Sequence, residues 1–535
     1  MATNKELNII TEQQDSQDSK KLDSPTPTSE PISSNKRIAK NAIMLYIRMF
    51  LSMIVGLYTS RVVLNTLGVV DYGIYGVVGG VVSMMGFLNA SMAGATSRFI
   101  TFELGKGNNQ RIKDTFSSAL IIHIGIALIV FVLAETIGLW FLNNKLDIPE
   151  ERMHAAHWVY QMSILSTMLG ITQVPYNACI IAHERMGVFA YIEILNVTLK
   201  LLIVYLLVIG EFDKLILYSI LTFAISVIII MIYRIYCIHK FQECHFNWIW
   251  NKEILRPLLS FSGWDLYGNM CVTARVYGST FLVNMFFGVI LNAAYSLSNM
   301  VYGVIVNFSS NVIQAFRPQI IKLYAINRYD EFNKILRNAI IYTIIFFAYF
   351  AVPLLLETNY LFDLWLSEVP AYSVLFCKLM LIAYIFDPII NVLNISIHST
   401  GKIKLLSLCG GTMHILYIPI LYVVFNTYQN PTYMYIVLLF VSFCILLSSS
   451  IIACKLIPEI KIKCIFTAII KIYFIIAITY ILCYSIQSLI PSSISRLIIM
   501  IISSTTLLSL LSYFLLLDND VKELIKNRIK YISKF

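Results

Sequence analysis

Apolar residues recur along the chain in runs of about 20, and short polar segments separate the runs. A helix of that length crosses the hydrocarbon layer of a bilayer, so each run predicts one membrane span. The pattern predicts an all-α, polytopic membrane protein with about 14 spans, arranged as two blocks of six and a final pair. The expected spans are residues 42–64, 73–95, 116–141, 157–182, 187–209, 214–237, 260–286, 291–316, 335–356, 371–398, 403–425, 432–454, 465–487 and 494–517.

The polar segments divide the chain into five expected parts. The first part is rich in Ser, Asp, Gln and Pro, is too polar to fold alone, and lacks the apolar core of a signal peptide. The parts are a disordered cytosolic tail at 1–38, an N-terminal six-helix lobe at 39–238, a cytosolic linker at 239–258, a C-terminal six-helix lobe at 259–456, and two extra helices with a cytosolic tail at 457–535.

The composition agrees with a membrane protein and excludes a soluble globule. Hydrophobic residues make up 58% of the chain and charged residues 13%, with a mean hydropathy of +0.74. The net charge of +10 is spread over short loops, which argues against a nucleic-acid partner. The ten cysteines contain no C-x-x-C pair and no set spaced with histidines, so neither a disulfide framework nor a metal site is indicated.

The basic residues alternate between the two sides of the predicted spans. Loops that follow even-numbered spans hold 16 Lys and Arg residues, whereas the opposite loops hold 4. Because basic loops stay in the cytosol, both chain termini are expected there. The opposite loops are all short, so no folded domain is expected outside the membrane.

The two six-span blocks begin alike, which suggests an internal repeat. Residues 67–75 (LGVVDYGIY) can be aligned with residues 287–295 (FGVILNAAY), a shift of 220 positions. Six spans per copy in one orientation imply two bundles related by an axis along the membrane normal, an arrangement that encloses a central site in many transporters. Chance similarity between apolar segments is the alternative explanation.

Four of the cations within the predicted spans are candidates for a functional role, because an ionised side chain there is costly unless it is paired or hydrated. Arg48 and Arg61 lie toward the two ends of the first span, Lys200 in the fifth, and Arg275 near the middle of the seventh. Arg48 and Arg61 could instead extend to lipid headgroups. Guanidinium groups bind phosphate oxygens in a forked geometry and stay charged, so such residues around a cavity suit an anionic solute.

Two spans carry polar stripes. The fifth span has Glu193, Asn196 and Lys200 at i, i+3 and i+7. The tenth has a longer stripe beside Pro388, which can break the helical ladder of hydrogen bonds. A carboxylate or histidine facing a cavity suits coupling to H⁺ or Na⁺, whereas hydrogen bonding between helices is the structural alternative. The candidate coupling and polar-stripe residues are Glu193, Asn196, Asp265, Asp387, Asn391, Asn394 and His398.

Motifs of enzymatic chemistry are missing from the sequence. It contains no Walker sequence, no G-x-S-x-G and no H-E-x-x-H, which disfavours hydrolysis or group transfer. The chain is therefore expected to be a transporter without a catalytic residue, metal or cofactor.

The start of the first block resembles a known family. Residues 41–48 (NAIMLYIR), 60–64 (SRVVL) and 71–75 (DYGIY) are similar to the N-terminal signature of Wzx-type polysaccharide flippases. These belong to the multidrug/oligosaccharidyl-lipid/polysaccharide exporter (MOP) superfamily and include O-antigen and capsule flippases. The resemblance extends to the span count, the tandem six-span blocks and the two extra C-terminal spans, but only the first two spans resemble the family residue by residue.

The resemblance implies a function and a location. It implies translocation of an undecaprenyl-diphosphate-linked oligosaccharide across the bacterial inner membrane, by alternating access of two lobes, for the synthesis of lipopolysaccharide or capsule. Membrane lipids, the polysaccharide polymerase and its chain-length machinery are the candidate partners. The charged cavity of the family would correspond here to Arg48, Arg61, Lys200 and Arg275.

Other functions remain open from the sequence. A cation-coupled multidrug or metabolite exporter of the same superfamily would have the same span pattern. An O-antigen polymerase-type enzyme is disfavoured because such enzymes carry a large periplasmic loop, which this chain lacks. A scaffold for envelope machinery has only the basic cytosolic loops in its favour.

Overall fold

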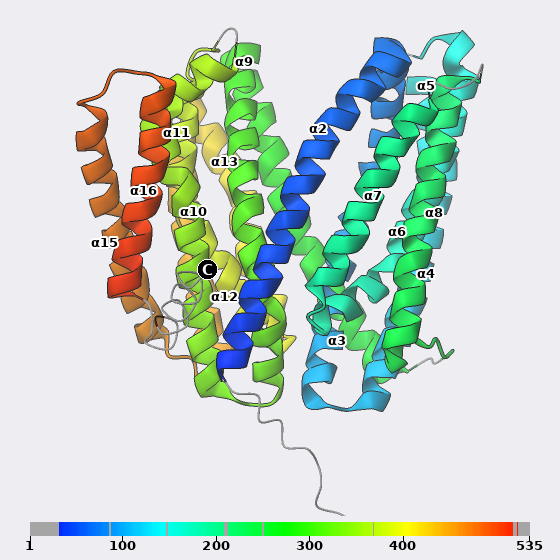
Figure 1. Ribbon diagram of the computed structural model, residues 1–535, viewed down its shortest axis with the longest axis horizontal. Coiled ribbons are helices and arrows are strands. Elements are labelled where there is room, and N and C mark those ends of the chain that lie inside the picture. The colour runs from blue at the N-terminus through cyan, green and yellow to red at the C-terminus, as the bar shows by residue number, and fades with distance from the viewer. Residues whose placement is uncertain are drawn as a thin grey trace, which may run out of the picture.

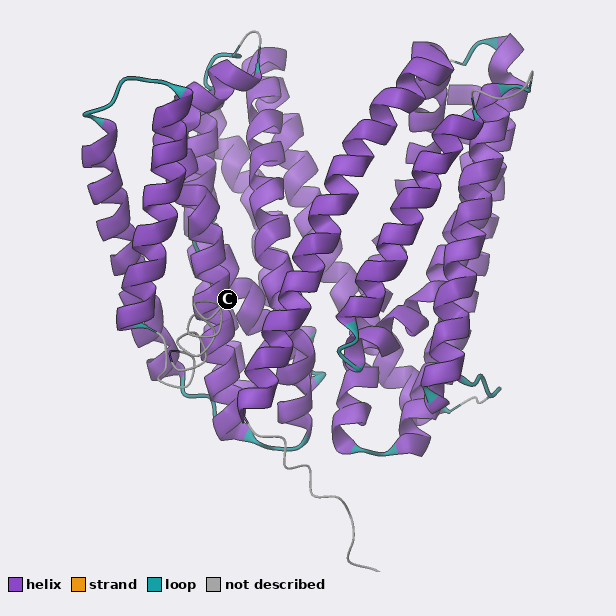
Figure 2. Ribbon diagram, in the orientation of Figure 1, coloured by secondary structure: helices purple, strands orange, loops and turns teal. Residues whose placement is uncertain are grey.

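The computed structural model describes residues 31–84, 87–145, 148–207, 212–248, 251–366, 369–516 and 522. Every regular element in these residues is a helix (Figure 2). Ten helical segments of the described chain are long and apolar enough to cross a membrane. The all-α, polytopic class that the apolar runs predict is thereby confirmed. The first helix begins at Pro31, within the segment predicted to be a disordered tail.

The helices form two bundles (Figure 1). The N-terminal lobe contains α2 (Pro31–Met84), α3 (Phe87–Lys106), α4 (Asn109–Leu133), the π-turn η1 (Ala134–Gly138), α5 (Leu139–Lys145), α6 (Glu150–Ala182), α7 (Met186–Leu206), α8 (Lys214–Lys240) and the short η2 (Gln242–Cys244). The C-terminal lobe contains α9 (Lys252–Ala325), α10 (Tyr329–Trp365), α11 (Ser373–Ala383), α12 (Asp387–Thr400), α13 (Lys404–Tyr428), α14 (Tyr433–Leu456), α15 (Ile462–Gln487) and α16 (Ile494–Leu515).

A glycine bends each of the two longest helices, α2 and α9, and divides it into two segments, which we call its arms. Helix α9 has 74 residues, and a straight helix of that length would run about 110 Å, far beyond a bilayer. It bends at Gly288, and α2 bends at Gly68, both with a φ of +81° that glycine adopts without the strain of a Cβ. The two positions are 220 residues apart, the shift at which the repeat segments align. Each of α2 and α9 thus consists of two helical segments that meet at the glycine, in addition to the ten apolar segments of the described chain.

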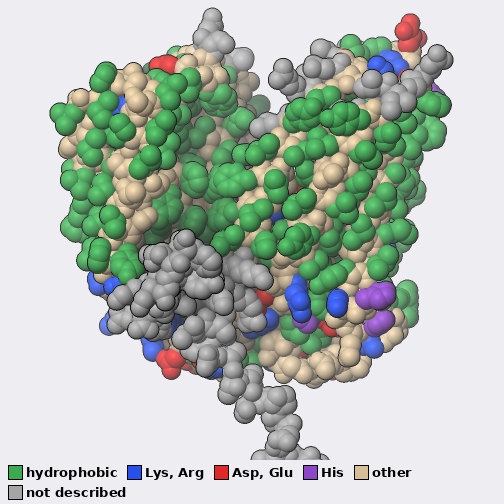
Figure 3. All heavy atoms as spheres, viewed as in Figure 1, with side chains coloured by type: hydrophobic (Ala, Val, Ile, Leu, Met, Phe, Trp, Pro, Cys, Tyr) green, Lys and Arg blue, Asp and Glu red, His purple; other side chains and the backbone are tan. Residues whose placement is uncertain are grey.

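The two lobes meet at one end of the molecule and part at the other (Figure 1). We call the end where α2 begins the basic end, because Lys106, Arg185 and Arg328 lie in or beside its turns. Blue basic side chains gather toward this edge in Figure 3, whereas a notch separates the lobes at the opposite end. Helix α2 runs diagonally from the C-terminal lobe at the basic end to the N-terminal lobe at the opposite end.

Hydrophobic packing holds the lobes together near the basic end. Met92 and Ala95 of α3, with Ala119 of α4, form one buried cluster with Leu258 and Phe261 of α9. On the outer flank, α15 and α16 pack against α10. The largest core lies inside the C-terminal lobe and contains residues from every helix from α9 to α15. The C-terminal lobe thus has a more extensive core than the N-terminal lobe.

Arg152 of α6 joins three helices at the opposite end of the N-terminal lobe. Its Nε donates to Asp71 of α2 at 2.8 Å, and its Nη1 donates to Asp213, the N-cap of α8, at 2.6 Å. Burial by itself raises the pKa of Asp213, but hydrogen bonds from Arg152 and from the first turn of α8 outweigh it. They hold the pKa of Asp213 below its ordinary value of 3.8.

Acid should weaken this junction. Because the pKa of Asp213 is lowered in the folded protein, its ionised carboxylate stabilises the folded state at pH values above the ordinary pKa of 3.8. This contribution is lost as the pH falls below that value. We expect Arg152→Met to lower the stability at neutral pH by about 1 kcal/mol and to reduce its acid dependence. Melting curves in detergent at neutral and acid pH measure both, with the exposed Lys214→Met as control. The same acid dependence in wild type and Arg152→Met would contradict the assignment.

Candidate functional site

A chain of polar side chains crosses the interior of the C-terminal lobe. Arg275, on the first arm of α9, is only 7% exposed, and its Nη1 donates to the Tyr384 hydroxyl at 2.7 Å. The Tyr384 ring stacks on Tyr302, with centroids 4.0 Å apart. The Tyr302 hydroxyl then donates to Asp387 Oδ2 at 2.6 Å. Two residues predicted separately, Arg275 and Asp387, thus belong to one buried network.

The break between α11 and α12 positions the network. Pro388 is the second residue of α12 and has no backbone N–H, so it cannot continue a hydrogen-bonded ladder from the preceding turn. The chain turns at residues 384–386, and Asp387 begins the new helix. Tyr384 and Asp387 therefore lie on either side of a helix break within the membrane-spanning segment.

A small cavity adjoins Asp387. Its volume is about 30 Å³, and both apolar and polar residues of α9, α10 and α12 line it. The Ser309 hydroxyl in this wall is buried and has no hydrogen-bond partner. A space of this size holds one water molecule or one small cation. No group of three His, Cys, Asp or Glu residues with metal-binding geometry occurs in the described chain. The polar lining residues are Tyr302, Ser309, Ser310, Thr343, Asp387 and Asn391.

The N-terminal lobe carries a second polar cluster between α2 and α7. Glu193 Oε1 accepts hydrogen bonds from Ser52 at 3.3 Å and from Asn196 at 3.5 Å. The Arg48 guanidinium lies over the Phe189 ring, 4.7 Å from its centroid. The polar stripe expected on the fifth span therefore faces α2 through Glu193 and Asn196.

The remaining predicted residues lie apart from these two clusters. Lys200 is exposed on α7, and the side chain of Arg61 lies outside the described residues. Asp265 accepts from Asn269, one turn along α9, at 3.2 Å. Asn394 accepts from Ser449 of α14, and the His398 ring packs edge-on against Phe261. The long stripe of the tenth span is thus divided among different neighbours.

Near the basic end, arginine from the N-terminal lobe caps a helix of the C-terminal lobe. Arg98 of α3 donates through Nε to the carbonyl of His398 at 3.2 Å and through Nη2 to that of Ser399 at 2.8 Å. It lies beside Gly401, whose φ is +77°; a Cβ there would approach the guanidinium within 2.9 Å. The guanidinium satisfies carbonyls that the end of α12 leaves open.

A reciprocal contact joins the lobes a second time. Glu184, in the turn after α6, accepts from Gln319 at 2.7 and 2.8 Å and from Lys322 at 2.8 Å, both on α9. We call Arg98, Glu184, Gln319 and Lys322 the inter-lobe seam. Each lobe thus supplies a polar side chain to the end of a helix in the other, as expected for two related repeats.

Sequence reasoning missed several residues of these sites. Tyr302 and Tyr384 link Arg275 to Asp387, but tyrosines in spans are too common to mark a site. Arg98 is one of the 16 basic residues that the sequence analysis assigns to loops, yet only 4% of its surface is exposed. Glu184 offered the clearest signal, because it is the acidic residue between His183 and Arg185 in a basic turn.

A bulky side chain placed where α3 contacts α9 should separate the two lobes at the basic end. A Cβ on Gly105 of α3 would lie 3.1 Å from both Lys322 Cα and Ala325 Cβ of α9. Gly105→Leu should therefore force these helices apart. We expect a longer distance between spin labels placed at the exposed positions Arg111 and Lys402.

Gly105→Leu has a matched control in Gly125→Leu on α4, where no atom lies within 4 Å of the added Cβ. This variant should leave the distance between the labels unchanged. Pulsed electron paramagnetic resonance gives the distance distributions. An unaltered distribution in Gly105→Leu would contradict the role of this contact in closure.

Comparison with known proteins gives the fold a counterpart. No family model and no curated protein matches the sequence. A mutant of the Vibrio cholerae MATE transporter VcmN is similar in structure, with a TM-score of 0.64, 16% identity, and coverage of 80% of this chain and 98% of that one. The chain has the MATE transporter fold.

Two further MATE structures agree. An outward-facing multidrug resistance MATE transporter of the MOP superfamily matches with a TM-score of 0.64 and 11% identity, over 80% of this chain and 96% of that one. The MATE transporter ClbM in complex with Rb⁺ matches with a TM-score of 0.62 and 15% identity, over 78% and 94%. The MATE fold agrees with the superfamily that the N-terminal residues resemble. These likenesses concern the fold alone.

Proposed function

We propose that this protein is a flippase that moves undecaprenyl-diphosphate-linked oligosaccharides across the bacterial inner membrane. The observation that carries the proposal is the arrangement of the lobes, which part at one end and close at the other through the inter-lobe seam (Figure 3). Such an arrangement suits alternating access, in which the open end and the closed end exchange. The basic end would face the cytosol, with both termini on that side.

The charges within the helices support an anionic substrate. Arg48 and Lys200 lie on the adjacent helices α2 and α7, and Arg275 supplies a third positive charge in the C-terminal lobe. A diphosphate offers several oxygens for forked contacts to guanidinium. The attached sugars are too polar for hydrocarbon, so they would travel between the lobes while the prenyl tail stays in lipid.

The network around Asp387 is the proposed coupling element. A proton or Na⁺ at Asp387 would change the charge opposed to Arg275 through Tyr302 and Tyr384. The adjoining cavity of about 30 Å³ is large enough for one small cation. Loading and release of this ion would favour different arrangements of α9, α11 and α12.

An exporter of drugs or metabolites is the second candidate. It is favoured by the fold of the multidrug resistance MATE transporter, which this chain shares at 11% identity. Such an exporter would use the same lobes and the same coupling element for a different solute. Both functions are compatible with this fold, so the phenotype of a strain that lacks the protein is needed to distinguish them.

A strain deleted for this protein tests the proposal. We expect it to accumulate lipid-linked oligosaccharide and to lose surface polysaccharide, with both restored by the wild-type chain. Lys200→Gln should restore poorly, whereas Lys214→Gln, at an exposed lysine that begins α8, should restore fully. Unchanged polysaccharide together with increased sensitivity to organic cations would instead identify a drug exporter.

A further inference from the structure

The segment that connects the two lobes has a described part, residues 241–248, which we call the linker loop. It follows α8, one of the apolar segments long enough to cross a membrane, so it leaves the hydrocarbon layer directly after Lys240. Figure 2 shows the loop after α8 projecting from the outer flank of the N-terminal lobe, near the basic end. The linker loop belongs neither to the buried network nor to the inter-lobe seam.

Three contacts hold the backbone of the linker loop against the N-terminal lobe. Glu243 Oε1 lies 2.5 Å from Nε2 of His183, in the turn after α6. Cys244 is buried in an apolar cluster that includes residues of α4, α6 and α8. The backbone N–H of Asn247 donates to the Ser117 hydroxyl of α4 at 3.2 Å. The path of the loop is therefore fixed by the lobe on which it lies.

Two aromatic side chains extend outward from this fixed backbone. Phe246 is 42% exposed and Trp248 is 76% exposed. Their rings contact each other edge to face, with centroids 6.2 Å apart. Removing such a pair from water is favourable, because both rings have large apolar surfaces. Tryptophan in particular is enriched where a membrane meets water, since its ring is then covered while its N–H stays hydrated.

Basic side chains flank the aromatic pair. Lys240 precedes the linker loop, and Lys252 and Arg256 follow it in the first two turns of α9; all three are exposed. Glu253 is the one exposed carboxylate among the described residues from 240 to 256. The exposed charge of this region is therefore positive, which favours a surface of anionic lipid.

We propose that the linker loop inserts Phe246 and Trp248 into the boundary between headgroups and acyl chains of a leaflet that contains anionic phospholipid. A lipid surface fits better than a soluble protein, because the loop lies at the end of a spanning helix and on the outer flank of its lobe. The insertion anchors the N-terminal lobe at the membrane surface, where the chain passes to the C-terminal lobe. This inference does not depend on the identity of the transported solute.

A nitroxide label in the full-length protein tests the insertion. The protein is reconstituted in vesicles of phosphatidylcholine and phosphatidylglycerol, and a genetically encoded nitroxide replaces one residue at a time, so the native cysteines stay in place. The measurement compares collisions of the nitroxide with oxygen, which concentrates in hydrocarbon, and with a water-soluble nickel complex.

The label at Trp248 should collide mainly with oxygen. A label at Asn109, exposed in the turn between α3 and α4 at the same end, should collide mainly with the nickel complex (Figure 1). Equal accessibility of the two labels to the nickel complex would overturn the proposal. That result is also the one expected if the aromatic pair were reserved for a soluble protein partner.

The lipid charge is tested with the same label. Phosphatidylglycerol should place the label at Trp248 deeper than phosphatidylcholine alone does, and Lys240→Gln/Lys252→Gln/Arg256→Gln should remove this difference. Arg111→Gln/Arg328→Gln/Lys402→Gln removes as much charge from exposed positions at the same end and should keep it. The preference for anionic lipid is wrong if both triple variants respond alike, or if the depth is the same in the two lipids. The label at Trp248 in the otherwise unchanged chain tests insertion even if a triple variant fails to fold.

Discussion

Replacing Arg275 by methionine is expected to abolish transport and to destabilise the C-terminal lobe by about 3–5 kcal/mol. Arg275 is buried, and its guanidinium is linked to Asp387 through Tyr384 and Tyr302. The variant keeps most of the side-chain volume but removes the charge. A buried carboxylate then loses the positive charge that opposes it, and the Tyr384 hydroxyl loses its donor.

A double variant separates stability from transport. Arg275→Met/Asp387→Asn has no buried charge at either position, so it should melt closer to wild type than Arg275→Met does. It should still fail to export, because both the cation and the coupling carboxylate are missing. Arg275→Lys is the matched control for charge and should retain more stability. Full export by the double variant would remove this network from the mechanism.

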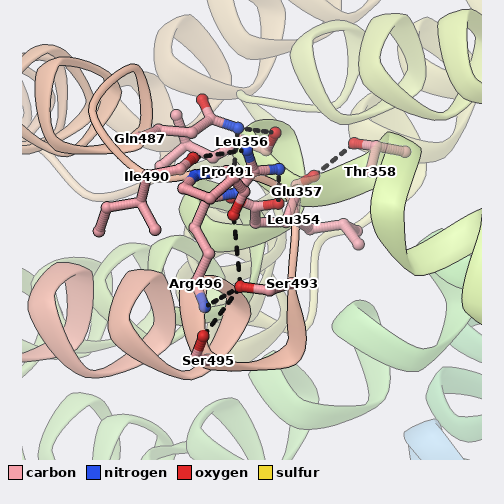
Figure 4. Close-up of polar contacts among 10 residues, drawn as sticks. All are labelled: Leu354, Leu356, Glu357, Thr358, Gln487, Ile490, Pro491, Ser493, Ser495 and Arg496. Carbon is pink, nitrogen blue, oxygen red and sulfur yellow. Dashed lines mark hydrogen bonds and ion pairs between the residues drawn. The ribbon is translucent and has the colours of Figure 1, made fainter.

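Arg496→Met should produce the largest loss of stability on the outer flank, also about 3–5 kcal/mol. Glu357 of α10 has a side chain that is 0% exposed, and Arg496 of α16 donates to it at 2.8 Å. Gln487, at the end of α15, donates to the same carboxylate at 3.2 Å and to the carbonyl of Leu356 at 2.7 Å. Figure 4 shows these side chains converging between the three helices.

The predicted loss of stability arises because Arg496→Met leaves the buried carboxylate of Glu357 without its cationic partner. Removing the charge of Glu357 should therefore restore part of the stability. Glu357→Gln/Arg496→Met should recover part of the melting temperature that Arg496→Met loses. Arg328→Met is the control, because Arg328 and its partner Glu331 are 43% and 34% exposed and contribute little. Equal melting temperatures for Arg496→Met and Arg328→Met would contradict this account of the α15–α16 anchor.

The apolar runs predicted the fold class because a bilayer forces the backbone to satisfy itself within each helix. The same reasoning placed breaks between residues 64 and 73 and between residues 286 and 291, and the backbone is non-helical there, at Gly68 and Gly288. It could not show that each break is a sharp bend at one glycine, because that depends on a backbone angle. The repeat alignment nevertheless pointed to this position in both blocks.

The candidate sites were predicted only in part. Periodicity placed Glu193 and Asn196 on one face of a helix, and they share a hydrogen bond. It could not show that Tyr384 and Tyr302 lie between Arg275 and Asp387, because that depends on how α9 packs against the break in the tenth span. Nor could it tell a buried inter-lobe charge from a loop charge, since both follow the same positive-inside pattern.

The central claim is that this chain carries a lipid-linked oligosaccharide across a membrane, and the most direct test is translocation in proteoliposomes that contain the purified protein. The measurement is the rate at which undecaprenyl-diphosphate oligosaccharide becomes accessible to a sugar-binding protein that cannot cross the membrane. We predict that wild type accelerates this exposure over protein-free vesicles and that Asp387→Asn does not. A wild-type rate equal to that of empty vesicles, in the presence of H⁺ and Na⁺ gradients, would contradict the claim.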